Sequence, residues 1–203
     1  MKLLLLPALL LFSTTLLQAQ TCHYNDLSYS LRFTVQVKRI EDKKMDRPAQ
    51  VKLFIINRHS GRQVQLIEYT SEYLFDKTFT RAKASRSYTT GKRARNEAMD
   101  NDWGDVVVAD FNFDGREDIA IIKDSGGNGG PMYYYYLQNS KGRFVQDQFL
   151  SEKMEFFPTW INKHKRTLTT LVHANAYQKA KTAYRLNTRT GQWSKTKRSF
   201  VNY

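Results

Sequence analysis

The sequence predicts an all-β protein, built as an antiparallel sandwich or barrel. Two observations predict this class: short apolar segments alternate at period two, and turn residues separate them at regular intervals. No long amphipathic helical pattern interrupts the series. An aromatic content of 13% with only four prolines is typical of a folded chain.

The alternation is clearest in 31–37, where every second residue is apolar. Two further segments, 51–56 and 64–69, flank Asn57-Arg-His-Ser-Gly61, which predicts a hairpin. The remaining strand candidates are short runs rich in β-branched and aromatic residues: 106–109, 119–122, 133–137, 144–145, 168–172, 183–186 and 192–196.

The segment Asp110-Phe-Asn-Phe-Asp-Gly-Arg-Glu-Asp118 joins two of these candidates and has the spacing of a calcium loop. Calcium takes six to eight oxygen ligands, and a tight loop supplies them from every second residue around a glycine. The predicted ligands are the side chains of Asp110, Asn112, Asp114 and Asp118, together with the backbone carbonyl of Arg116.

An EF-hand is excluded, because it needs a glutamate at the twelfth position and a helix on each side. Ile121 stands at that position, and apolar β-branched runs flank the loop. The prediction is therefore a strand–calcium loop–strand unit. The alternative is a hairpin turn rich in Asp, Asn and Gly, since these residues also favour turns.

This loop and its flanks resemble the calcium motif of FG-GAP/VCBS repeats, which form the blades of integrin-type β-propellers. A propeller needs several blades, and this chain has one copy of the motif. The order of the segments that follow is similar to that in a family of small periplasmic β-sandwich proteins with one calcium loop. These segments are Gly127-Asn-Gly-Gly130, Tyr133-Tyr-Tyr-Tyr136, Gly142-Arg-Phe-Val145, Ala183-Tyr-Arg-Leu186 and Gly191-Gln-Trp193. That family is related to inhibitors of invertebrate-type lysozyme.

The resemblance covers about 105–199 and implies inhibition of a cell-wall hydrolase by a loop inserted into its active cleft. The inhibitors carry a Ser-Gly-x-x-Tyr pattern in that loop. The corresponding stretch here is His173-Ala-Asn-Ala-Tyr177, so Tyr177 alone is carried over as a contact. We expect the contact surface to lie on loops, namely 173–181 and the glycine-rich loop 125–130 beside the calcium unit, with Gly127, Asn128 and Gly129. The alternative is that Tyr177 is a packed strand residue and that the glycines form an ordinary flexible surface loop.

Residues 1–19 have the pattern of a secretory signal peptide: Lys2, an apolar stretch from Leu3 to Leu17, and Leu17-Gln-Ala19 as a cleavage site. The stretch is shorter than a transmembrane helix, and no later segment is apolar for long enough to cross a membrane. We expect an exported protein, periplasmic or secreted, with one domain over 20–203.

Cys22 is the single cysteine, so no intrachain disulfide can form. It could be lipidated, free or bonded to another molecule. Thr21 precedes it, whereas lipoprotein signals favour glycine, alanine or serine there.

The net charge is +13 with a pI near 9.8, and no acid follows Glu155. Residues 81–104, which carry six Lys and Arg before Glu97, predict a long basic loop. A basic face attracts anionic partners, which for an exported protein are acidic envelope glycans or an acidic protein. Export and the lack of a recognition motif argue against nucleic acid. A lysozyme-like target would have to be acidic or neutral, because like charges repel.

No catalytic set is evident. The four histidines, His23, His59, His164 and His173, lack the spacing of a zinc site, and the acids that cluster belong to the calcium loop. We expect a binding protein without enzymatic activity: an inhibitor of a peptidoglycan hydrolase, or a module that binds acidic glycans through a basic face.

Overall fold

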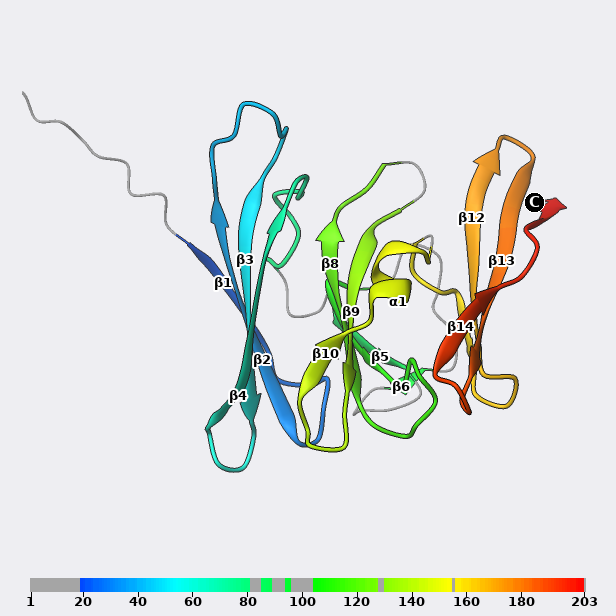
Figure 1. The fold of residues 1–203 in the computed structure, drawn as a ribbon. Helices are drawn as coiled ribbons and strands as arrows, with labels where there is room; N and C mark the ends of the chain where they lie inside the picture. The colour runs from blue at the N-terminus through cyan, green and yellow to red at the C-terminus, as the bar shows by residue number, and fades with distance from the viewer. Residues whose placement is uncertain are drawn as a thin grey trace, which may run out of the picture.

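The computed structural model describes residues 19–80, 85–88, 94–95, 104–127, 130–154 and 156–202. These residues form three β-sheets that lie one beside the other, from the N-terminal sheet at the left of Figure 1 to the C-terminal sheet at its right. Almost all strand pairs are antiparallel. The predicted all-β class is confirmed, as a sandwich-like stack of sheets.

The N-terminal sheet is a four-stranded meander with the order β1-β2-β3-β4. Alternate residues of β2 and β3 are buried, as period-two patterning requires. The predicted hairpin joins β3 to β4, and its Asn57 side chain accepts hydrogen bonds from the backbone N–H groups of His59 and Ser60. The strands are β1 (Gln20–Tyr24), β2 (Leu31–Arg39), β3 (Ala49–Asn57) and β4 (Gln63–Ser71).

The central sheet has the order β10-β9-β8-β7-β5-β6. All four residues of β7 and the first five of β8 are buried. Because successive strand residues point to opposite faces, full burial means that both faces of the sheet are covered. The central sheet is therefore the middle layer. Its strands are β5 (Ser85–Tyr88), β6 (Ala94–Arg95), β7 (Val106–Ala109), β8 (Asp118–Asp124), β9 (Met132–Gln138) and β10 (Phe144–Gln146).

The basic segment 81–104 differs from the predicted loop in the parts that the structure describes. Ser85–Tyr88 pairs in parallel with β7, and Ala94–Arg95 pairs in parallel with β5. Backbone hydrogen bonds to β7 hold β5, so an apolar side-chain pattern was not needed to make it a strand. The other residues of 81–103 lie outside the described part of the chain.

The C-terminal sheet has the order β11-β12-β13-β14, and β15 pairs with another part of β13. The one helix of the described residues, α1 (Gln148–Glu152), packs beside β9, and Asp147 caps its first turn by accepting from the Leu150 N–H at 2.8 Å. The strands are β11 (Trp160–Asn162), β12 (Thr167–Asn175), β13 (Gln178–Asn187), β14 (Gln192–Lys195) and β15 (Ser199–Asn202). Within the described ranges, no helix has the length and apolarity of a membrane span.

Aromatic side chains fill the space on the C-terminal side of the central sheet. Phe111 packs edge-on against Tyr135 with ring centroids 5.1 Å apart, and Phe157 lies against both rings. On the other side, Gln65 of β4 donates to the Phe144 carbonyl at 2.8 Å and accepts from the Phe144 N–H at 3.0 Å. This side chain thereby pairs the open edge of β10 with the N-terminal sheet.

Cys22 is buried in β1 opposite Val35, with a free thiol whose pKa is raised by burial. A lipid or an intermolecular disulfide on this sulfur would require β1 to leave the sheet. The structure therefore favours the free thiol among the three states considered from the sequence.

Asp105 is a buried carboxyl at the start of β7, and it accepts a hydrogen bond from the Phe79 N–H at 2.7 Å. Burial raises its pKa to about 7, against about 3.9 in an unfolded chain. The Asp105 carboxyl binds its proton more tightly in the folded protein than in the unfolded chain. Its contribution to the free energy of unfolding is therefore greatest below about pH 4 and is lost as pH rises through 7.

We expect Asp105→Asn to remove this pH dependence while keeping an acceptor for Phe79. The variant should match the wild type near pH 4 and exceed its free energy of unfolding at pH 8.5 by about 1–3 kcal/mol. Urea titrations of both proteins at the two pH values measure this. A variant less stable than the wild type at pH 8.5 would show that the ionised carboxylate stabilises the fold.

Candidate functional site

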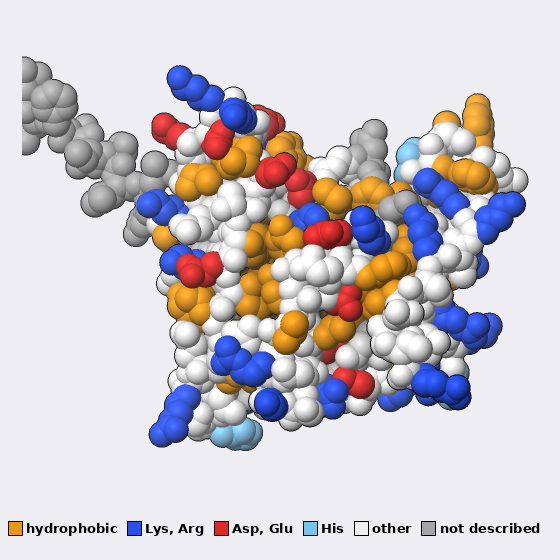
Figure 2. All heavy atoms as spheres, viewed as in Figure 1, with side chains coloured by type: hydrophobic (Ala, Val, Ile, Leu, Met, Phe, Trp, Pro, Cys, Tyr) orange, Lys and Arg blue, Asp and Glu red, His pale blue; other side chains and the backbone are white. Residues whose placement is uncertain are grey.

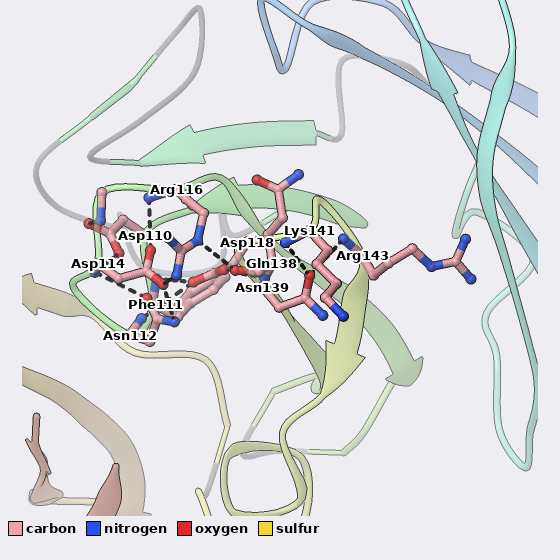
Figure 3. A network of polar contacts seen from close by, with 11 residues as sticks. Asp110, Phe111, Asn112, Asp114, Arg116, Asp118, Gln138, Asn139, Lys141 and Arg143 are labelled. Carbon is pink, nitrogen blue, oxygen red and sulfur yellow. Dashed lines mark hydrogen bonds and ion pairs between the residues drawn. The ribbon is translucent and has the colours of Figure 1, made fainter. Parts of the chain in front are cut away.

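The loop Asp110–Asp118 connects β7 to β8, as the sequence predicts, and its side chains bond to its own backbone (Figure 3). Asp110 is buried and accepts from the N–H groups of Asp114 and Gly115, both at 2.9 Å. Asn112 also accepts from the Asp114 N–H, at 3.1 Å. Gly115 has a φ of +87°, which a residue with a side chain rarely adopts. These bonds bring oxygen atoms from Asp110, Asn112 and Asp114 to the inside of one turn.

Asp118 holds the base of the loop. One of its carboxylate oxygens accepts from the Phe111 N–H at 2.9 Å and the Asn112 N–H at 3.3 Å, and the other accepts from the Gln138 N–H at 2.8 Å. The side chain is fully buried, and burial raises its pKa to about 8. Three bonds leave this carboxylate one further acceptor position.

Arg116 contributes more than the predicted backbone carbonyl. Its guanidinium contacts the Asp114 carboxylate and donates through Nε to the Gln138 carbonyl at 2.8 Å. The side chain therefore ties the loop to β9, and it competes for one oxygen that calcium would use. A cation in the loop would displace the guanidinium from Asp114.

The donor set suits a hard cation, because it consists of carboxylate, amide and carbonyl oxygens arranged around one turn. Among the described residues, no three Asp, Glu, His or Cys side chains gather as a metal cage. The loop would thus depend on the Asn112 amide and the Arg116 carbonyl in addition to its acids. Burial also raises the pKa of Asp110, and a bound cation would offset the cost of burying its charge.

The glycine-rich loop follows β8, so it begins at the opposite end of that strand from the loop Asp110–Asp118. It is not beside the calcium unit, contrary to the expectation from the sequence, because β8 is a seven-residue strand, about 20 Å long. Ser125 begins the loop, with its N–H donating to the Tyr73 carbonyl at 2.9 Å and its hydroxyl accepting from the Phe75 N–H at 2.8 Å. Gly127 is described and accepts from the Gly130 N–H at 3.0 Å, whereas Asn128 and Gly129 lie outside the described residues.

Gly126 and Gly127 provide a matched pair for substitution. Gly126 has a φ of +63°, and a Cβ there would lie 2.0 Å from the Gly130 carbonyl oxygen, whereas a Cβ on Gly127 meets nothing within 4 Å. We expect Gly126→Ala to lower the free energy of unfolding by about 1–3 kcal/mol and Gly127→Ala to change it by less than about 0.5 kcal/mol. Chemical denaturation of both variants measures the difference. If neither substitution changes the free energy of unfolding, the glycines are not required by the backbone of this loop.

Tyr177 lies at the tip of the hairpin between β12 and β13, and its side chain is 80% exposed. Its N–H donates to the Asn175 side chain at 2.9 Å, which shapes the turn. The alternative of a packed strand residue is therefore excluded. The hairpin tip and the end of β8, where the glycine-rich loop begins, both lie at the upper end of the molecule in Figure 1, and the loop Asp110–Asp118 lies at the lower end.

A basic cavity of about 640 Å³ lies at the lower end of the C-terminal sheet, and the sequence patterns alone did not reveal it. The turn before β12 and the turn after β13 form it, with Arg166 and Arg189 from these turns and Arg185 from β13. Its other lining residues include His164, Lys165, Leu186, Asn187, Thr188 and Ser194. The sequence indicates part of this cluster, because no acid follows Glu155 and residues four apart, such as Arg185 and Arg189, would share a face if both lay on a strand. No local pattern showed that Arg166 lies beside them.

A second cavity, of about 450 Å³, lies between the loop Asp110–Asp118 and the C-terminal sheet, and we call it the aromatic cavity. Phe113 of the loop and Trp193 of β14 line it, together with Asp147. Trp193 stacks on Phe149 with ring planes 9° apart and donates through Nε1 to Asp147 at 3.3 Å. This surface depends on packing between segments far apart in sequence, so no local pattern could predict it.

No family model and no curated protein matches the chain. Among solved structures, the fold is similar to that of a type IV secretion system related protein from Xanthomonas, with a TM-score of 0.56 and 14% sequence identity. The match covers 86% of this chain and 79% of the other. At this identity the similarity concerns the fold alone.

Proposed function

We propose that this chain is an exported β-protein, stabilised by calcium, that binds a macromolecular partner of the cell envelope and has no enzymatic activity. The partner we propose is a lysozyme-like peptidoglycan hydrolase, whose active cleft would accept the hairpin tip at Tyr177. The observation that carries the proposal is the exposure of this ring at the end of a two-stranded hairpin.

An exposed tyrosine on a hairpin suits insertion into a cleft. The ring offers a large apolar area with few rotatable bonds, and its hydroxyl can form a hydrogen bond inside the cleft. β12 and β13 pair along their length from His173–Lys179 to Thr167–Arg185, so the tip stands on two paired strands. The surrounding residues of this tip, His173 to Lys181, include two lysines and no acid, which favours an acidic rim on the partner.

The calcium loop would serve the fold and not the contact, because it lies at the opposite end of the molecule from Tyr177 (Figure 1). Extracellular calcium sites have dissociation constants on the order of 10⁻⁴–10⁻³ M, which suits an exported protein. The fold that the chain shares with the Xanthomonas protein, described as related to type IV secretion, is compatible with export.

A second candidate function is binding of acidic envelope glycans, and the basic cavity favours it. On the face shown in Figure 2, Lys and Arg side chains gather over the C-terminal sheet at the right. The segment 156–203 holds ten Lys and Arg and no acid.

A pull-down from envelope extract with residues 20–203 separates the two functions. The hydrolase proposal predicts recovery of a lytic enzyme by the wild type and not by Tyr177→Ala, at moderate salt and in calcium. Recovery of polysaccharide alone, lost in high salt, would favour the glycan function, because exposed charge interactions are screened. Recovery of neither would contradict both.

A further inference from the structure

The basic cavity and the aromatic cavity adjoin, since Arg166, Leu186 and Thr188 line both. We propose that they form one binding site for an acidic saccharide, with a sugar ring against Trp193 and Phe113 and a carboxylate on Arg166, Arg185 and Arg189. This inference rests on the second candidate function and specifies its site and ligand class.

The aromatic part is held in place from several sides. Trp193 stacks on Phe149 and bonds to Asp147, and its ring centroid lies 6.3 Å from that of Phe113. Phe113 has a φ of +63°, a conformation that is unusual for a bulky residue and that the calcium loop maintains. Both rings are only partly buried. Fixed aromatic rings at a cavity wall can stack against the apolar face of a ring-shaped ligand.

The polar groups of the aromatic cavity suit hydroxyl groups. Asn112, Asp147 and Thr188 line it and offer carboxylate, amide and hydroxyl oxygens. The negative charges here already have partners: Asp114 contacts Arg116, and Asp147 accepts from Trp193 and Leu150. Because these acids already have partners, they can accept hydrogen bonds from sugar hydroxyls beside the arginine cluster.

The basic part supplies the site for the anion. Arg166, Arg185 and Arg189 are exposed, and in the described part of the chain no carboxylate lies within ion-pair distance of any of them. The Arg166 guanidinium contacts the Thr188 hydroxyl, which fixes it where the two cavities meet. Arginine matches a carboxylate through two parallel N–H donors.

A sugar acid matches all three features. Its ring fits the aromatic wall, its hydroxyls fit the oxygen atoms and its carboxylate fits the arginine cluster. A simple inorganic anion would not use the aromatic wall. A nucleic acid would also be attracted by charge, so single-stranded DNA is included among the comparison ligands below.

The test is calorimetric titration of residues 20–203 with trigalacturonic acid, with a neutral trisaccharide of galactose, inorganic phosphate and a short single-stranded DNA as comparison ligands. We expect the wild type to bind trigalacturonic acid and none of the three comparison ligands. The double variant Arg185→Glu/Arg189→Glu should raise its Kd at least 10-fold, and Trp193→Ala should do the same. If Trp193→Ala proves unstable, Trp193→Leu keeps an apolar volume and removes the stacking surface.

The matched control is Lys179→Glu/Lys181→Glu, which makes the same change in net charge at the other end of β13. It should change the Kd less than 2-fold. Equal weakening by both double variants would overturn the site, because binding would then follow net charge. Equal binding of phosphate or DNA would overturn the sugar specificity.

The outcomes also separate this inference from the function on which it rests. If the wild type binds trigalacturonic acid and the arginine and Trp193 variants bind equally well, the glycan function holds and the site is wrong. If the wild type binds no acidic saccharide, the glycan function fails and the site fails with it.

Discussion

Calcium is expected to raise the melting temperature of residues 20–203 by several degrees. At 10 mM calcium and a Kd on the order of 10⁻⁴–10⁻³ M, mass action on the folded state stabilises it by about 1.4–2.7 kcal/mol. For a domain of this size that corresponds to roughly 3–10 °C. Thermal denaturation in calcium, and in a chelator, measures the difference.

Asp114→Ala should abolish the calcium-dependent increase, because it removes one of the oxygens inside the loop. Arg116→Ala is the matched control. It removes the guanidinium that contacts Asp114 and the Gln138 carbonyl but keeps the predicted backbone ligand. We expect this variant to be slightly less stable without calcium and to keep the full increase with it.

Two results would contradict the calcium prediction. One is an identical melting curve for the wild type in calcium and in chelator. The other is an increase that Arg116→Ala loses and Asp114→Ala keeps, which would place the cation outside the loop. In either case the loop would be a turn that the hydrogen bonds of Figure 3 hold together without a cation inside it.

Tyr177→Ala is expected to weaken partner binding by about 30- to 1000-fold, the cost of about 2–4 kcal/mol that truncation of a central aromatic contact brings. The free energy of unfolding should change by less than about 0.5 kcal/mol, because the side chain is 80% exposed. Binding to the captured partner by surface plasmon resonance and melting by circular dichroism measure the two effects.

Tyr29→Ala is the control for this variant. Tyr29 is also an exposed tyrosine, 65% accessible, but it lies in the loop before the second strand of the N-terminal sheet. We expect it to leave partner binding within 2-fold of the wild type. Equal losses in both variants would point to non-specific adhesion, and full binding by Tyr177→Ala would show that the hairpin tip is not the contact.

Much of the fold could be predicted from local patterns, because the strands that carry the core alternate strictly or are wholly apolar. Leu31–Arg39 shows the first pattern and Val106–Ala109 the second. Two of the missed strands have neither. Ser199–Asn202 is exposed at every residue, and Ser85–Tyr88 is held by parallel backbone pairing with β7. Backbone pairing with the neighbouring strands, and not their own composition, makes these segments strands.

The same distinction applies to the sites. Asp110–Asp118 could be predicted because its residues are adjacent in sequence and the glycine at 115 is required by its positive φ. The exposure of Tyr177 could be anticipated only from the family resemblance. For the proposed acidic-saccharide site, the sequence predicted a basic face and an acidic glycan as ligand but not the cavity. Phe113, Arg166 and Trp193 come from three turns and strands that only the packed sheets bring together.

The most direct test of the hydrolase proposal is the rate at which envelope extract lyses purified peptidoglycan, followed by turbidity, while residues 20–203 are added in calcium. We predict that the wild type lowers the lytic rate until it saturates and that Tyr177→Ala does not lower it at the same concentration. A lytic rate unchanged by saturating wild-type protein, or one that rises with it, would contradict the proposal.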